Sequence, residues 1–90
     1  MTKILIVDDD PDIVESMRVV LESKGYRVSC AASGEEGLKK ARQEGPDLII
    51  LDVMMPEGAD GFEVAREIKA DLKTKHIPIL MLTAIREKTG

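Results

Sequence analysis

Continuous apolar runs of four residues occur three times along the chain, at residues 4–7, 48–51 and 79–82. Runs of this length, built from Ile, Leu, Val and Met, are typical of parallel strands that are buried on both faces. Residues 26–30 form a less hydrophobic pattern that predicts one further strand. We therefore expect four strands, and a polar residue directly follows each of the three apolar runs.

The segment between the first two strands predicts an amphipathic helix. Asp10 can cap this helix, Pro11 suits its first position, and Gly25 lies where a left-handed residue would end it. Its apolar residues recur at the spacing of one helical face. They are Ile13, Val14, Met17, Val20 and Leu21.

Two further helices are predicted by their caps. Ser33 and Glu36 form a capping-box pattern that opens a helix ending at Gly45. Asp60 and Glu63 make another cap pair after a loop over residues 53–59, whereas residues 85–90 are polar and show no clear element. Strand and helix thus alternate up to the last strand. This order predicts an α/β fold, a doubly wound parallel sheet with helices on both faces.

The carboxyl ends of parallel strands lie on one rim of such a sheet, and ligands bind there. The first strand delivers Asp8 and Asp9 to this rim, the third delivers Asp52, and the fourth delivers Thr83. We therefore expect Asp8, Asp9 and Asp52 to converge in one pocket.

Three converging carboxylates favour a metal-dependent phosphoryl site. Carboxylates at close range repel and raise one another's pKa unless a cation compensates, and Mg²⁺ prefers such oxygen ligands. An Asp carboxylate is also a nucleophile that can form an aspartyl phosphate. Any one of these acids could instead be a helix cap, and Asp10 before Pro11 fits that role. Capping alone, however, does not predict the joint pattern.

Four segments carry a resemblance to a known family: residues 4–9, 51–56, 60–63 and 78–84, which read ILIVDD, LDVMMP, DGFE and PILMLTA. They resemble the receiver domain of two-component response regulators, which has a flavodoxin-like, CheY-like fold. The resemblance covers essentially the whole chain. It implies a phosphorylation switch rather than a turnover enzyme. The implied phosphodonor is a sensor histidine kinase, a phosphotransfer protein or a small acyl phosphate.

The resemblance also assigns roles to the residues of the site. Asp52 resembles the phosphoacceptor, and Mg²⁺ is the implied cofactor. Asp9 would bind the ion directly, and Asp8 would reach it through water. Asp52 and the backbone carbonyl of Met54 would complete the protein ligands.

The same resemblance implies a switch next to the fourth strand. Thr83 resembles the hydroxyl that moves toward the phosphoryl group, and Ala84 resembles the small residue that leaves room for it. Phosphorylation would then shift a pre-existing equilibrium between two surface states. An output domain in a longer natural chain is a further implied partner.

The chain departs from the family after the fourth strand. The family continues through a fourth helix, a fifth strand with a following Lys, and a fifth helix, whereas Lys88 lies too close to Thr83 to be that Lys. Residues 1–90 therefore predict an incomplete receiver domain. A truncation or proteolytic piece is the favoured explanation, with a domain swap and a degenerate receiver as alternatives. The exposed edge of the last strand would invite a dimer or a domain swap.

Composition narrows the function classes. The net charge is −4 and there is no basic stripe or patch. This composition argues against direct binding to nucleic acid and against binding to an anionic membrane. The apolar run at the start is too short for a signal peptide, so the cytoplasm is the expected compartment. Cys30 is the single cysteine, which excludes an internal disulfide, and we expect it to be a small hydrophobe on a buried strand.

Two competing functions have to be weighed. A degenerate pseudo-receiver would act through protein contacts without phosphorylation. The intact Asp8, Asp9, Asp52 and Thr83 argue against such decay, whereas the absent Lys argues for it. An aspartate-nucleophile phosphatase would place two acids two residues apart, as Asp8 and Asp10 are. A chain of 90 residues leaves no room for a substrate-covering cap domain, so we disfavour the phosphatase.

Overall fold

The structure, a computed structural model, describes residues 2–52 and 61–82. Four parallel strands form a sheet in the order β2-β1-β3-β4. The strands are β1 (Lys3–Val7), β2 (Arg27–Ala31), β3 (Leu48–Asp52) and β4 (Ile79–Leu82). The helices are α1 (Pro11–Ser23), α2 (Gly34–Glu44) and α3 (Gly61–Ala70). The predicted α/β fold is therefore confirmed.

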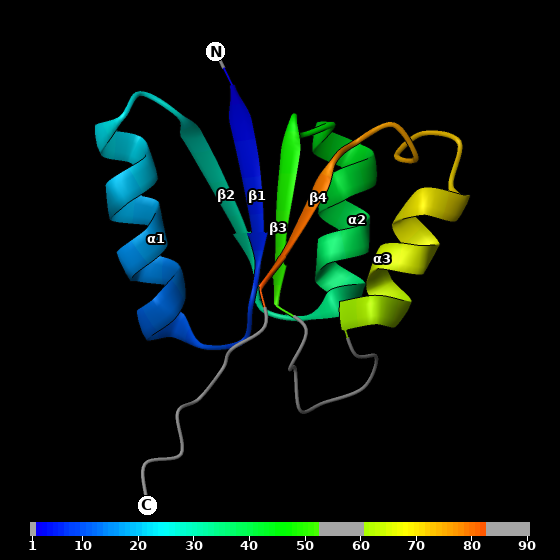
Figure 1. The fold of residues 1–90 in the computed structure, drawn as a ribbon, viewed down its shortest axis with the longest axis horizontal. Coiled ribbons are helices and arrows are strands. Elements are labelled where there is room, and N and C mark those ends of the chain that lie inside the picture. Colours follow the sequence, from blue (N-terminus) through cyan, green and yellow to red (C-terminus); the bar gives the residue numbers. More distant parts are fainter. Residues whose placement is uncertain (1, 53–60, 83–90) are drawn as a thin grey trace, which may run out of the picture.

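Helices cover both faces of the sheet, with α1 on one face and α2 and α3 on the other (Figure 1). The side chains of β1 alternate between these two layers. Leu5 and Val7 belong to the cluster under α2 and α3, whereas Ile4 and Ile6 belong to the cluster under α1. All four are buried, which explains why this strand has an unbroken apolar sequence.

The strand β2 begins and ends one residue later than the sequence pattern predicts. The amide of Tyr26 donates to a carbonyl in the last turn of α1 at 3.2 Å, so Tyr26 still belongs to the turn after that helix. At the other end, the amide of Asp8 donates to the carbonyl of Ala31 at 3.0 Å and keeps Ala31 in the sheet. The position of β2 is thus set by its neighbours rather than by its own hydrophobicity.

The helix ends follow their predicted caps. The carboxylate of Asp10 accepts hydrogen bonds at the start of α1, and the hydroxyl of Ser33 does so at the start of α2. Gly25 and Gly45 follow these helices with φ values of 94° and 58°, where glycine is favoured. None of the described helices is long and apolar enough to cross a membrane.

The α1 side of the sheet is covered unevenly by the described residues. Val14, Met17 and Leu21 of α1 pack against the buried residues of this face, and α1 lies beside β2 in Figure 1. Leu80 of β4, at the opposite edge of the sheet, is 51% exposed. Because β4 is an edge strand among the described strands, its outer edge can pair with another segment or another chain.

The turn between α3 and β4 is held by side chains that bond to backbone carbonyls. The buried hydroxyl of Thr74 donates to the carbonyl of Ile68 at 2.6 Å. The ammonium of Lys69 donates to the carbonyl of Ile77 at 2.7 Å. These bonds fix the path by which the chain enters β4, and no sequence pattern pointed to them.

The helix α2 approaches β1 so closely that position 37 has no room for a side chain. A Cβ atom added to Gly37 would lie 2.8 Å and 3.0 Å from the two Cγ atoms of Val7. Val7 is fully buried and cannot move toward solvent. Glycine at this position therefore lets α2 close over the end of β1, directly before the acids.

Replacing Gly37 by Ala should lower the free energy of unfolding by on the order of 1 kcal/mol. The overpacking costs about 1–3 kcal/mol and exceeds the roughly 1 kcal/mol of helix propensity that Ala gains. Urea unfolding followed by circular dichroism measures this loss. In the double variant Gly37→Ala with Val7→Ala, the loss should be smaller than the sum of the two single losses. Additive losses would contradict the close approach.

Candidate functional site

The ends of β1 and β3 bring three carboxylates together. Val7 pairs with Leu51 in the parallel register, so Asp8 and Asp52 come next at the same edge of the sheet. One carboxylate oxygen each from Asp8, Asp9 and Asp52 lie within 4.8 Å of one another. The predicted convergence of the three acids is therefore confirmed.

Two of these acids are buried and the third is open to solvent. Asp8 is 4% exposed and Asp52 is 8% exposed, whereas Asp9 is exposed. Hard divalent cations such as Mg²⁺ prefer carboxylate oxygens and keep several of their waters. A cluster of three carboxylates with one side open to water fits that preference.

The carboxylate of Asp8 is held in a fixed position at the end of β1. Its Oδ1 accepts a hydrogen bond from the amide of Asp10 at 2.9 Å. Burial raises the pKa of Asp8, and the nearby charge of Asp52 raises it further, although the Asp10 amide opposes the shift. A bound cation would remove this penalty because it stabilises the charged carboxylates.

Part of the predicted site lies outside the described residues. Met54, Thr83 and Ala84 belong to this part, as do the predicted loop over residues 53–59, the Asp60 cap and the tail over residues 85–90. The roles expected for these positions stay predictions.

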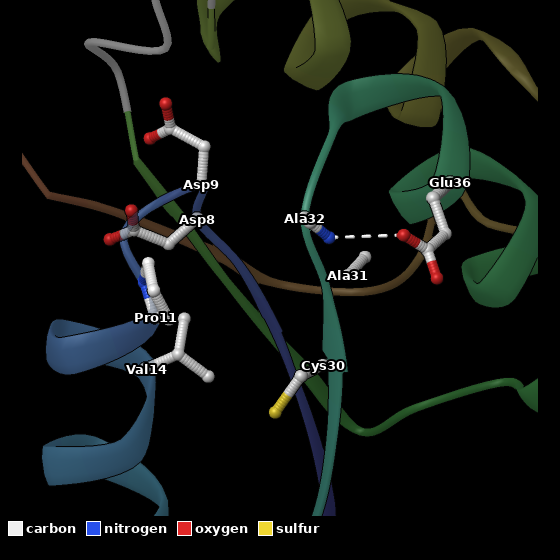
Figure 2. A pocket seen from close by; sticks show the side chains of 8 residues that line it. All are labelled: Asp8, Asp9, Pro11, Val14, Cys30, Ala31, Ala32 and Glu36. Carbon is white, nitrogen blue, oxygen red and sulfur yellow. Dashed lines mark hydrogen bonds between the residues drawn. The ribbon is translucent and has the colours of Figure 1, made fainter.

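A pocket of about 360 Å³ lies beside the acids, between the start of α1 and the end of β2 (Figure 2). Its lining residues are Asp8, Asp9, Pro11, Val14, Cys30, Ala31, Ala32 and Glu36. In Figure 2 the carboxylates of Asp8 and Asp9 point away from Cys30 and Glu36, so the pocket lies next to the acid cluster rather than within it. Sequence reasoning missed this pocket, because its walls come from three separate elements.

Two lining residues differ from their predicted environment. Cys30 is half-buried rather than buried, because β2 is an edge strand, and burial raises the pKa of its thiol. The carboxylate of Glu36 accepts from the amide of Ala32 at 3.1 Å, one residue before the Ser33 amide that a capping box would use. The Ser33 hydroxyl still accepts from the Glu36 amide at 3.2 Å.

Nearly the whole chain matches the model of one protein family. The model of the response regulator receiver domain matches residues 4–89. The chain belongs to this family. The predicted receiver-domain resemblance is thereby confirmed, and receiver domains are signalling domains of two-component systems.

Two curated relatives are identical to this receiver domain at about half of the aligned positions. The transcriptional regulatory protein AfsQ1 of Streptomyces coelicolor is 49% identical over 93% of this chain and 36% of its own length. The alkaline phosphatase synthesis transcriptional regulatory protein PhoP of Bacillus subtilis is 50% identical over 96% of this chain and 35% of its own length. The chain thus spans about a third of the length of these relatives.

Solved structures show the same fold. The N-terminal domain of a response regulator receiver protein from Methanoculleus marisnigri has a TM-score of 0.90 at 49% identity, covering 93% of this chain and 68% of that one. The response regulator TrrA of Thermotoga maritima, solved in complex with Mg²⁺-BeF, has a TM-score of 0.86 at 45% identity. That match covers 96% of this chain and 72% of TrrA.

Replacing Asp8 by Asn should stabilise the metal-free protein at neutral pH. Asn keeps an oxygen for the Asp10 amide but carries no charge to bury beside Asp52. Because the folded state raises the pKa of Asp8, it binds this proton more tightly than the unfolded chain, and stability is lost as the pH rises above about 4.

The gain in the free energy of unfolding from Asp8→Asn should therefore be small near pH 4 and should grow toward pH 7. Urea unfolding in the presence of a chelator, at several pH values for both proteins, measures the gain. A gain that does not depend on pH would contradict a raised pKa of Asp8.

Proposed function

We propose that this chain is a phosphoryl-accepting switch in which Asp52 takes a phosphoryl group in a Mg²⁺-dependent reaction. The observation that carries the proposal is the meeting of three carboxylate oxygens, from Asp8, Asp9 and Asp52, within 4.8 Å of one another. Two of the three residues are buried, so their charges are costly without a cation. Membership of the receiver-domain family supports a phosphoryl-accepting role for this cluster over helix capping alone.

Four groups of this chain would hold the ion: the carboxylates of Asp8, Asp9 and Asp52, and the backbone carbonyl of Met54. Asp9 would be the direct ligand, and Asp8 would act through a water molecule. When bound, Mg²⁺ neutralises charge on the attacking carboxylate and on the phosphoryl oxygens. The complex of the relative TrrA with Mg²⁺-BeF supports this choice of ion.

Asp52 supplies the nucleophile from the end of β3. One oxygen of its carboxylate attacks the phosphorus of a phosphohistidine or an acyl phosphate, and a new P–O bond forms. The bond between phosphorus and the donor breaks, and the donor leaves with the electron pair. Thr83 would then donate a hydrogen bond to a phosphoryl oxygen, with Ala84 leaving room for its movement. Two surface states would change their populations as a result.

The partners follow from this reaction. A sensor histidine kinase or a phosphotransfer protein would deliver the phosphoryl group, and an output domain in a longer protein would read the surface state. AfsQ1 and PhoP, which are transcriptional regulatory proteins, support such an output. The half-exposed Leu80 on the edge strand β4 supports contact with a second copy, as a dimer or a domain swap.

Incubation with acetyl phosphate and Mg²⁺ should add the mass of one phosphoryl group to the protein. Asp52→Asn should abolish this gain, because an amide does not replace the carboxylate as nucleophile. Intact-mass spectrometry measures the gain, and a chelator in place of Mg²⁺ should also remove it. If a folded protein gains no mass, the proposal is wrong, and the alternative of a pseudo-receiver without phosphorylation is favoured.

Replacing Asp9 by Asn should weaken Mg²⁺ binding by roughly tenfold or more, since losses of that size follow even when outer partners of a metal site are removed. Asp12→Asn is the matched control, because Asp12 is an exposed acid in the first turn of α1 and lies outside the cluster. Amide NMR titrations with Mg²⁺ measure both affinities. Equal affinities in the two variants would remove Asp9 from the set of ligands.

A further inference from the structure

Hydrogen bonds through Asp10 connect the carboxylate of Asp8 to the start of α1. The amide of Asp8 is held by the carbonyl of Ala31 at 3.0 Å, which fixes its backbone against β2. Its Oδ1 accepts from the amide of Asp10 at 2.9 Å. These two hydrogen bonds fix Asp8 at the end of β1.

Asp10 in turn is fixed by the helix that it caps. Its Oδ1 accepts from the amides of Asp12 and Ile13 at 3.0 Å and 3.4 Å. Its carbonyl accepts from the amide of Val14 at 3.1 Å. Its backbone is extended, with φ −95° and ψ 107°, as a residue before proline requires. The orientation of the Asp10 amide therefore depends on its side-chain bonds to α1.

The helix α1 is itself docked on the sheet. Val14, Met17 and Leu21 pack against the cluster that contains Ile4 and Ile6 of β1. The strand that carries Asp8 and the helix that Asp10 caps are thus two rigid elements. Asp10 connects these two elements. Its amide donates to Asp8 at the end of β1, and its carboxylate accepts from two amides at the start of α1.

We infer that Asp10 is a positioning residue of the cation site, because its carboxylate holds the turn whose amide orients the carboxylate of Asp8. This inference rests on the proposed function, since it concerns the affinity of that site for Mg²⁺. We expect the affinity for Mg²⁺ to depend on the acceptor oxygen of Asp10 and not on its negative charge.

Two substitutions separate the oxygen from the charge. Asp10→Asn removes the charge but keeps an oxygen that caps helices as well as Asp does. Asp10→Ala removes both. The affinity for Mg²⁺ should fall roughly tenfold in Asp10→Ala, the scale of outer-partner effects in metal sites, and should change by less than about twofold in Asp10→Asn.

A matched control removes a cap elsewhere in the molecule. Ser33 caps α2 through a 3.2 Å bond from the Glu36 amide and lies outside the acid cluster. Ser33→Ala should lower stability to a similar extent as Asp10→Ala while leaving the affinity for Mg²⁺ unchanged. Amide NMR titrations with Mg²⁺, at a temperature where every variant is folded, measure these affinities.

Hydrogen exchange of the amide at position 10 gives a second readout that needs no metal. The exchange should be faster in Asp10→Ala than in the parent protein and should be nearly unchanged in Asp10→Asn and Ser33→Ala. Equal effects of the Ala and Asn substitutions on affinity would overturn the inference, and so would unchanged affinity and exchange in Asp10→Ala. If the parent protein binds no Mg²⁺, the proposed cation site is wrong, and the exchange rates still decide whether Asp10 holds the turn.

Discussion

The close approach of the Asp8 and Asp52 carboxylates at the ends of β1 and β3 is the interaction on which the site depends. Parallel register places them at the same edge, and burial leaves them only 4% and 8% exposed. Burial and the neighbouring charge of Asp52 raise the pKa of Asp8, because both disfavour its charged form. The amide of Asp10 opposes this rise through its hydrogen bond to the Asp8 carboxylate. A cation at this site, as proposed, would stabilise the charged carboxylates further.

The rest of the molecule serves to hold this edge of the sheet in place. The strand β1 is buried on both faces, with Leu5 and Val7 under α2 and α3, and Ile4 and Ile6 under α1. Gly37 allows α2 to lie directly over Val7, the last residue before the acids. Packing of this density leaves the carboxylates little freedom to move apart, which explains how a short chain keeps like charges together.

Family membership and local geometry support the same function by independent routes. The receiver-domain match gives the class of protein, and relatives with 49% and 50% identity extend it over more than nine-tenths of the chain. The geometry supports the proposed chemistry, because three carboxylate oxygens lie within 4.8 Å of one another and hard cations prefer ligands of this kind. The chain spans about a third of the length of those relatives. The output that it would control therefore belongs to the proposed function.

The four strands, the three helices and the acids at the strand ends could be predicted from the sequence, since periodicity, caps and apolar runs are local properties of the chain. The strand pattern misplaced β2 by one residue, because the end of β2 depends on the amide that Asp8 presents after β1. The capping pattern misplaced the partner of Glu36 by one residue, since its carboxylate accepts from the amide of Ala32 rather than that of Ser33. The observed strand order, the raised pKa of Asp8 and the half-burial of Cys30 depend instead on how the elements pack. These properties depend on distances between residues far apart in the chain, and such distances exist only once the elements have packed.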